Sequence, residues 1–497
     1  MAKQDRSARN TLSVFLIVTV FCLFLSSIAF GATGPKDWEK LYKQGKIDED
    51  ITAVSAVVKA KPKDAGARRW LGFLLLQKGN FEGALTHLKA ARELKADSDE
   101  LRLNLGMAYI GLNRSEEAIP ELLKAIELHK NYAQAYYNLG AAYLATHQLD
   151  KSIEAYQKTI ELAPNSASAY NNLGLVYQEK GNRDDSVAAL RKAAELNPND
   201  AQIAYNLGFA LKTNGDASGA GTAFTKCLSL DSKRYDAHMA LAELQSSAGK
   251  DADALAHYQA ASDLKPDEFS PLYNSGVLFS KMGRFAKAAA AFKAAVKVNP
   301  DDAEALAGMG WALFKSGKTA DGVAALQQAT AKSPTMVSAW LNLATALTAQ
   351  GSNAEAIKAW EAAIKLKPNH YAANINLGNL YIKSNEFDKA ASAYQAAAAI
   401  DPKSAEAFYG TGLAYSNLNK PDEAIAEYKK AIDANPKMGA AYNNLGVELE
   451  KKDQRDEAIA QYKKALEVDP NNADARKNLD RFNKPATSGA STTSKPS

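Results

Sequence analysis

The chain has 497 residues, and its 60 Lys and Arg residues nearly balance its 56 Asp and Glu residues, which leaves a formal net charge of +4. A globular chain of this length would be expected to form three or more domains. The basic residues are interspersed with the acidic ones, so the sequence lacks the clustered basic face that binds nucleic acid. We therefore expect no nucleic-acid partner. The two Cys residues are too few for a disulfide framework once the N-terminal segment that carries one of them is removed.

Residues 1–32 differ from the rest of the chain. Three basic residues precede an apolar run, Leu12 to Leu25, and small residues follow up to Ala32. This order is typical of a secretory signal peptide, with cleavage expected after Ala29 or Gly31. The segment predicts an exported chain with a periplasmic or other extracytoplasmic location.

Two alternatives remain open for this segment. The first is an uncleaved anchor in the inner membrane, because residues 11–30 approach the length of about 20 residues that spans a bilayer. Membrane contact would then be made through this segment alone, and the rest of the chain would still be exported. The second alternative is a cytosolic protein with a buried apolar N-terminal helix.

Residues 33–64 resemble a shortened helical hairpin. Gly45 falls where a turn is expected and Pro62 where the second helix should end. We interpret the segment as a degenerate N-terminal copy of the repeat that follows it, because terminal copies have a neighbour on one side only.

Residues 65–472 repeat with a fixed period, in twelve copies without insertions. We number the copies 1 to 12 and the positions within each copy 1 to 34; the copies begin at residues 65, 99, 133, 167, 201, 235, 269, 303, 337, 371, 405 and 439. Position 8 is Gly or Ala and position 24 is always large and apolar or aromatic, as in Gly174 and Leu190. A small residue opposite a large one lets two helices pack closely without voids.

Turn signals divide each copy into two helices. Position 15 is Gly in seven copies and Asn, Asp or His in the others, which are residue types that tolerate a left-handed turn after a helix. Position 32 is Pro in nine copies. Each copy therefore predicts helix A, a turn, helix B and a second turn. Neither helix can bury its apolar stripe alone, so neighbouring copies must stack.

This pattern resembles the tetratricopeptide repeat (TPR) family. One copy carries the matching residues Tyr170, Leu173, Gly174, Tyr177, Ser186, Leu190, Ala193 and Pro198. The resemblance implies an all-α fold, a right-handed superhelical solenoid of TPR helix-turn-helix repeats whose concave groove binds partners.

Two segments follow the twelve copies. Residues 473–483 repeat helix A only and predict a C-terminal capping helix. Residues 484–497 are rich in Ser, Thr, Pro and Gly, and we expect them to be disordered.

The sequence contains no recognisable catalytic or metal-binding motif. The six His residues are scattered without metal-ligand spacing. The stretch ending at Gly317 and Lys318 lacks the first Gly of a phosphate-binding loop, and no strand is expected before it. We therefore expect no catalytic residue, no metal, no cofactor and no enzymatic activity.

The candidate binding residues lie on a second stripe of helix A, at positions 2, 5, 6, 9, 12 and 13. By resemblance to the family, this stripe lines the concave groove. Position 6 is Asn in eight copies, namely Asn104, Asn138, Asn172, Asn206, Asn274, Asn342, Asn376 and Asn444. An Asn amide can donate to and accept from a peptide backbone whatever its sequence. The ladder is similar to the groove of the TPR superhelix in O-linked N-acetylglucosamine transferase, without that enzyme's catalytic domain.

An alternative interpretation is that this Asn is a family feature that only solvates the helix. Aromatic residues on the same stripe favour binding, since large apolar groups on a surface indicate a contact site. They are Tyr137, Tyr205, Tyr273 and Tyr409 at position 5 and Phe209 and Trp311 at position 9. The alternative is that these side chains pack against the neighbouring copy.

From these features we predict a non-catalytic scaffold that binds proteins or extended peptides in its groove, for cell-envelope assembly or export. One alternative is an accessory or regulatory subunit that recruits an envelope enzyme, such as a glycosyltransferase or protease. A second alternative is a purely structural spacer. The sequence does not define the oligomeric state.

Overall fold

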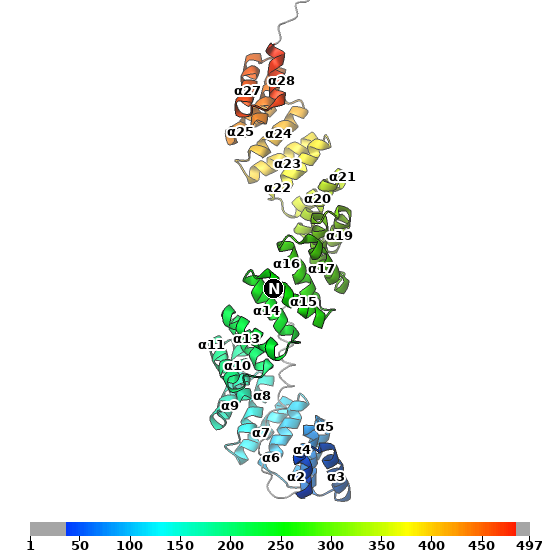
Figure 1. Cartoon of the computed structure of the whole chain (residues 1–497), viewed down its shortest axis with the longest axis vertical. Coiled ribbons are helices and arrows are strands. Elements are labelled where there is room, and N and C mark those ends of the chain that lie inside the picture. The colour runs from blue at the N-terminus through cyan, green and yellow to red at the C-terminus, as the bar shows by residue number, and fades with distance from the viewer. Residues whose placement is uncertain (1–35, 484–497) are drawn as a thin grey trace, which may run out of the picture. The chain divides into compact units, whose positions relative to one another are not determined.

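The fold between residues 36 and 483, the part that this computed structural model describes, is entirely helical, with 27 helices and no strand (Figure 1). The signal-peptide or anchor prediction and the predicted disordered tail lie outside the described residues. Contacts divide the chain into two compact units, unit 1 ending at His257 and unit 2 beginning at Tyr258. The division falls within α15 (Asp251–Leu264).

The helices of unit 1 that precede α15 are α2 (Lys36–Lys43), α3 (Ile47–Ala60), α4 (Ala65–Gln77), α5 (Phe81–Glu93), α6 (Asp99–Gly111), α7 (Ser115–Leu128), α8 (Ala133–Ala145), α9 (Leu149–Leu162), α10 (Ala167–Lys180), α11 (Arg183–Leu196), α12 (Ala201–Thr213), α13 (Ala217–Leu230) and α14 (Tyr235–Ser247).

The helices of unit 2 that follow α15 are α16 (Phe269–Lys281), α17 (Phe285–Val298), α18 (Ala303–Lys315), α19 (Thr319–Lys332), α20 (Val337–Gln350), α21 (Asn353–Leu366), α22 (Tyr371–Lys383), α23 (Phe387–Ile400), α24 (Ala405–Asn417), α25 (Pro421–Ala434), α26 (Gly439–Lys451), α27 (Arg455–Val468) and α28 (Ala473–Asn483).

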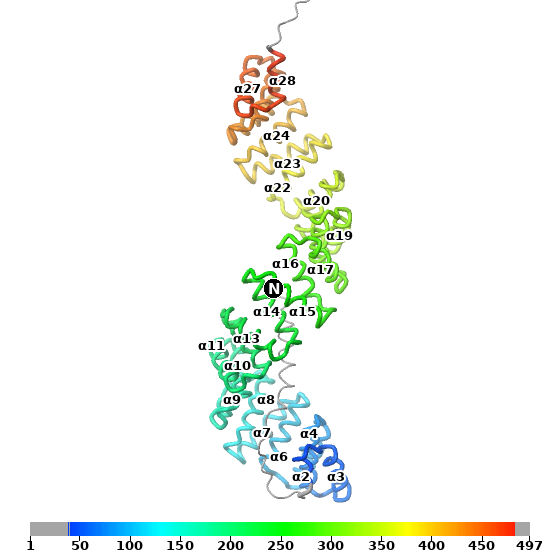
Figure 2. Tube along the Cα trace, in the orientation of Figure 1, coloured from blue at the N-terminus to red at the C-terminus, as the bar shows by residue number. Residues whose placement is uncertain are grey.

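Each copy forms the predicted pair of helices, and the chain trace in Figure 2 shows one hairpin after another within each unit. In copy 4, the hydroxyl of Ser166 accepts a hydrogen bond from the Ala169 N–H and so caps α10. Gly181 ends the same helix in a left-handed conformation, with φ of 90°. The helix and turn signals of the sequence therefore have a direct structural basis.

The turn at position 15 has the predicted backbone conformation even where the residue there is not Gly. Positive φ angles of 57° to 59° occur at this position in Asn113, His147, Asn385, Asn419 and Asp453. The left-handed region is accessible to Asn, Asp and His more readily than to other residues that carry a Cβ.

Helices A and B of a copy meet where position 8 faces position 24. In ten copies a Cβ added to the position 8 glycine would lie 3.0 Å or less from the large side chain at position 24; these glycines are Gly72, Gly106, Gly140, Gly174, Gly208, Gly276, Gly310, Gly378, Gly412 and Gly446. Real Cβ atoms almost never come this close to a neighbour. The small-against-large packing predicted from the sequence is confirmed.

The terminal helices cover the first copy of unit 1 and the last copy of unit 2. Trp38, Val54 and Trp70 are buried together where α2 and α3 meet α4. The Trp70 Nε1–H donates to the Asp50 carboxylate at 3.1 Å, and burial raises the pKa of Asp50 to about 6. At the other end, α28 packs against α27 and buries Ala475.

We predict opposite effects for two glycine substitutions in copy 5. Gly208→Ala places a Cβ 2.7 Å from the Phe224 ring and should destabilise α12 and α13 by about 1–3 kcal/mol. Gly221→Ala, in the interior of α13, meets nothing within 4 Å and should stabilise the helix by about 0.5–1 kcal/mol. Hydrogen exchange of these two helices measures both changes, and equal effects of the two substitutions would contradict the packing described above.

Candidate functional site

The Asn residues at position 6 lie at the boundary between successive copies. Two copies have Gly at this position, and a Cβ added to Gly308 or Gly410 would meet the ring at position 24 of the preceding copy at 2.8 and 2.5 Å. Position 6 is therefore a packing position as well as a member of the helix A stripe. The Asn residues of unit 1, Asn104, Asn138, Asn172 and Asn206, are buried, and those of unit 2, Asn274, Asn342, Asn376 and Asn444, are half-buried.

A hydrogen bond from position 6 to position 5 of the preceding copy recurs in both units. The structure brings together two pairs of predicted site residues in this way, Tyr137 with Asn172 and Tyr409 with Asn444. These amides join adjacent copies. The donor and acceptor side chains of these bonds are Asn172 and Tyr137 at 3.0 Å, Asn206 and Asn171 at 2.8 Å, Asn444 and Tyr409 at 3.1 Å, and Asn478 and Asn443 at 3.0 Å.

The same Asn bonds differently where the preceding copy has an apolar residue at position 5. Leu103 occupies that position before Asn138, and Leu341 occupies it before Asn376. Both Asn side chains donate instead to the backbone carbonyl four residues earlier on their own helix, at 2.7 and 2.8 Å. Where the position 5 residue offers an acceptor, as Tyr137 does, the amide of the next copy binds it, whereas Asn138 and Asn376 bind their own helices.

The position 5 tyrosines are neutral hydrogen-bonding groups. Burial raises the pKa of Tyr137, Tyr205 and Tyr273 to about 12, so each phenol keeps its proton at neutral pH. The Arg234 guanidinium lies 4.6 Å from the centre of the Tyr205 ring. The Tyr273 hydroxyl donates to the Glu304 carboxylate of the next copy at 3.3 Å.

Several position 9 side chains are apolar and at least partly exposed. Phe209 and Trp311 are half-buried, and Val277 is 43 % exposed, which is unusual for a large apolar residue in this protein. The Lys315 ammonium lies 5.7 Å from the centre of the Trp311 ring. Since α16 and α18 contact each other, Val277 and Trp311 belong to adjacent A helices of unit 2.

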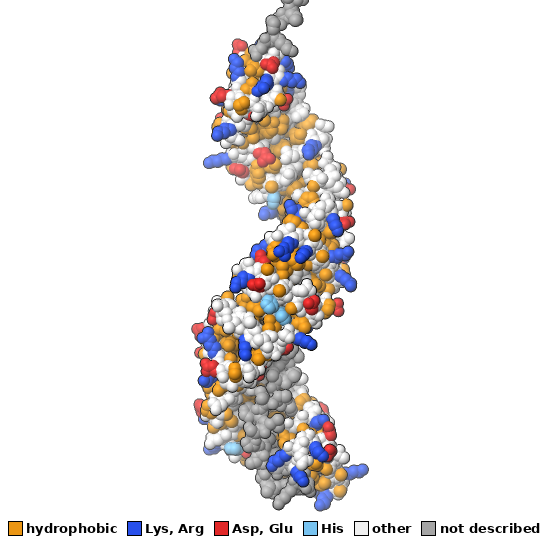
Figure 3. Space-filling model, viewed as in Figure 1, with side chains coloured by type: hydrophobic (Ala, Val, Ile, Leu, Met, Phe, Trp, Pro, Cys, Tyr) orange, Lys and Arg blue, Asp and Glu red, His pale blue; other side chains and the backbone are white. Residues whose placement is uncertain are grey.

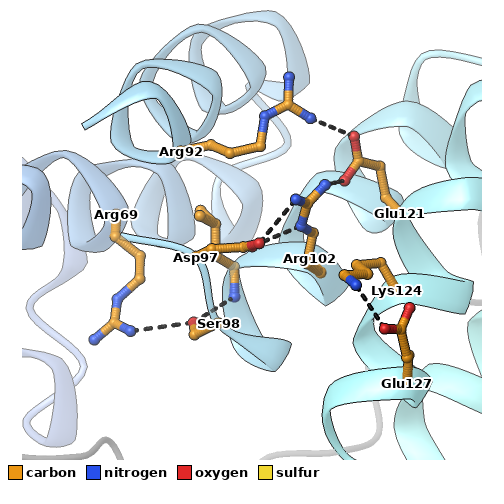
Figure 4. A network of polar contacts seen from close by, with 9 residues as sticks. Arg69, Arg92, Asp97, Ser98, Arg102, Glu121, Lys124 and Glu127 are labelled. Carbon is orange, nitrogen blue, oxygen red and sulfur yellow. Dashed lines mark hydrogen bonds and ion pairs between the residues drawn. The ribbon is translucent and has the colours of Figure 1, made fainter. Parts of the chain in front are cut away.

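A polar network that the sequence analysis did not single out joins copies 1 and 2. Figure 4 shows Arg92, Asp97, Arg102 and Glu121 in this network of unit 1. The Glu121 carboxylate accepts from Arg92 at 2.5 Å and from Arg102 at 2.6 Å. Asp97 also binds Arg102, which lowers the pKa of Asp97 and raises that of Arg102. The network joins α5 to α6 and α7.

His238 and His257 form a second polar contact that the sequence analysis missed, within copy 6. Their Nδ1 atoms are 2.9 Å apart, and His238 Nε2 is 3.1 Å from the Ser232 carbonyl oxygen. A carbonyl can only accept, so His238 carries its proton on Nε2 and His257 Nδ1–H is the donor between the rings. Burial, and then His238, lower the pKa of His257.

Both contacts join position 4 of a copy to position 23 of the same copy. Position 23 is Ala in seven copies, so Glu121 and His257 are visible departures from the repeat. Each has a polar partner at position 4, Arg102 and His238 respectively. Comparing these two positions copy by copy would have identified both pairs.

The arrangement is suited to binding. Residues 36–483 contain no group of three or more side chains that could hold a metal ion, and none of the helices in this range combines the length and apolar character of a membrane span. Basic and acidic side chains are interspersed on the face shown in Figure 3. The A helices offer amides, phenols and apolar side chains to a partner.

Stacked two-helix units that present one stripe from each A helix define an α-solenoid of the protein-binding class. Models of the tetratricopeptide repeat match residues 40–99, 131–199, 171–233, 273–335, 307–371, 341–405, 375–439 and 439–472, and a TPR repeat model matches 106–147. The chain belongs to the tetratricopeptide repeat family, and it is a protein–protein interaction scaffold of the kind that these repeats form. That fold is generally non-catalytic.

Solved structures of TPR proteins are similar to parts of the chain. MamA is 35% identical over 34% of this chain and 99% of its own, with a TM-score of 0.31. YrrB, described as a TPR protein with an unusual peptide-binding site, is 24% identical over 37% of this chain and 95% of its own, with a TM-score of 0.35. A TPR protein from Cytophaga hutchinsonii is 17% identical over 48% and 98%, with a TM-score of 0.44. No curated protein matches the sequence.

The hydrogen bond between copies gives a prediction for Asn444 and Tyr409. Asn444→Ala and Tyr409→Phe should each destabilise unit 2, and a double-mutant cycle should show a coupling of about 0.5–1.5 kcal/mol. The matched cycle of Asn376→Ala and Leu341→Ala should show less coupling, because that Asn binds its own helix. Hydrogen exchange of α24 and α26 measures the stability changes of the first cycle. A coupling energy no larger than that of the matched cycle would contradict a stabilising bond between Asn444 and Tyr409.

Proposed function

We propose that the scaffold binds extended peptides or peptide-like segments of partner proteins along the A helices of unit 2. The observation that carries the proposal is the exposure of Val277, 43 %, on the helix A stripe beside the aromatic residues Tyr273 and Trp311. Exposed apolar surface marks protein-interaction sites, and Trp and Tyr are enriched among the residues that supply most of the binding energy there.

Polar groups on the same helices complement these anchors. Asn274 and Asn342 at position 6 are half-buried, as are Asn376 and Asn444. The two N–H groups of an amide can serve different acceptors, so an Asn that donates one bond inside the protein keeps a second donor. We include these four residues in the binding surface as groups that meet a peptide backbone.

We further propose that the chain is exported and works in a bacterial cell envelope. The support is the order of basic, apolar and small residues in segment 1–32. Mass measurement of the chain recovered from periplasmic and membrane fractions tests this. A chain that starts near residue 30 supports cleavage, a full-length chain in the membrane supports an anchor, and a full-length chain confined to the cytosol would refute export.

We predict that Val277→Glu combined with Trp311→Ala abolishes capture of a specific partner from a membrane extract. The double variant introduces a charge at residue 277 and removes the ring at residue 311. It should remove most of the binding free energy, because a few central residues supply most of it in such surfaces. Leu366→Glu is the matched control, because Leu366 is a similarly exposed apolar residue, 39 %, on a B helix. Circular dichroism checks that both variants stay folded. If the Leu366→Glu control also loses the partner, or if both variants keep it, this surface is ruled out.

A further inference from the structure

The two units differ in the charge that helix A carries at position 13, its last turn. In unit 2 the lysine row consists of Lys281, Lys315, Lys383 and Lys451, all of them exposed. In unit 1 the same position holds no base, since its residues are Gln77, Gly111, Ala145, Glu179, Thr213 and Ser247. Position 13 belongs to the helix A stripe that is predicted to line the groove.

Other lysines near the ends of A helices form ion pairs between copies. Lys180 binds Asp150 at 2.5 Å and Lys212 binds Glu243 at 2.5 Å. Lys452, which directly follows the last lysine of the row, pairs with Asp422 in the same way. These pairs are structural, because each joins a copy to its neighbour.

The lysine row is only partly neutralised. The Lys451 ammonium binds the Glu448 carboxylate at 2.7 Å. Within residues 36–483, however, Lys315 and Lys383 form no ion pair. Lys315 lies over the rings of Phe285 and Trp311, at 5.8 and 5.7 Å, which positions its ammonium beside the apolar surface.

The lysine row runs one helical turn beyond the position 9 residues. Val277 precedes Lys281 by four residues, and Trp311 precedes Lys315 by four, so each apolar side chain and its lysine share a helix face. Adjacent packed helices are about 10 Å apart. A chain in the extended polyproline II conformation rises about 3.1 Å per residue and completes one turn in three residues, so it covers that distance in about three residues and returns a side chain to the same face. Carboxylates at every third position of such a chain would therefore be spaced like Lys281 and Lys315, which lie on the adjacent copies 7 and 8. Every second carboxylate would be spaced like Lys315, Lys383 and Lys451, which lie two copies apart.

We propose that unit 2 selects acidic segments, with carboxylates on the lysine row and apolar side chains on Val277 and Trp311. The inference rests on the proposed function, since it names the chemistry of the segment that the same surface binds. A nucleic acid fits less well, because Glu304 on α18 and Glu406 on α24 lie at position 2 of A helices of unit 2 and would repel a continuous polyanion.

Two synthetic peptides of equal length test the inference on the full chain, by fluorescence anisotropy. One carries Glu at every third position with Leu and Val between, and the other replaces each Glu by Gln. We expect the acidic peptide to bind at least tenfold more tightly, and its affinity to fall as salt is raised. Equal affinity for the two peptides, or no binding of the acidic one, would overturn the inference.

Two double variants with equal net charge test whether the lysine row is where the acidic peptide binds. Lys315→Gln with Lys383→Gln should weaken the acidic peptide at least fivefold and leave the Gln peptide unchanged. The control, Lys293→Gln with Lys358→Gln, removes exposed lysines from the B helices α17 and α21 and should change neither affinity. Equal weakening of acidic-peptide binding by both double variants would overturn the inference. A single-stranded oligonucleotide that binds as tightly as the acidic peptide, in a way that depends on Lys315, would also overturn it.

Failure of the inference can be told apart from failure of the proposed function. If the Gln peptide binds as well as the acidic one, and Val277→Glu abolishes both, unit 2 binds peptides on this surface without selecting acidic ones. If Val277→Glu changes the binding of neither peptide, the proposed surface itself is wrong.

Discussion

The close approach of a glycine at position 8 to a large side chain at position 24 is the constraint on which the rest of the structure depends. A Cβ on Gly446 would stand 2.6 Å from the Tyr462 ring, so a side chain at this position of α26 would force the ring or the helix to shift. This contact fixes the hairpin, and with it the direction in which each A helix presents its stripe. The position 5, 9 and 13 side chains then follow one another from copy to copy.

The repeat made most of the fold predictable. Helix positions, the left-handed turn at position 15 and the packing of helix A on helix B all follow from residue types that recur in phase from copy to copy. The division into two compact units within α15 was not predictable in this way, because the period continues through Asp251–Leu264 without a break. Contacts between copies depend on which two residues meet across a boundary. A repeat pattern shows only which residue types recur at each single position, so it does not predict where these contacts weaken.

The candidate site was likewise predictable at the level of single positions and not at the level of residue pairs. The sequence placed Asn172 and Tyr137 on one stripe, which is where they lie, but their bond to each other joins position 6 of one copy to position 5 of the copy before it. The prediction that such amides bind peptide remains a prediction. The pairing of His238 with His257 is not visible when each His is considered alone, because it is the antiparallel hairpin that brings positions 4 and 23 into contact.

The direction of the bond between copies also determines which copies can follow one another. Copy 4 has Asn at both position 5 and position 6, Asn171 and Asn172, so a second copy of it placed directly behind could accept and donate the same bond again. Copy 10, with Ile375 before Asn376, could not do so, because its own position 5 offers no acceptor. A gene duplication of copy 4 would thus lengthen the array with this hydrogen bond intact, whereas one of copy 10 would add a boundary without it. The order of the copies is part of what the sequence specifies.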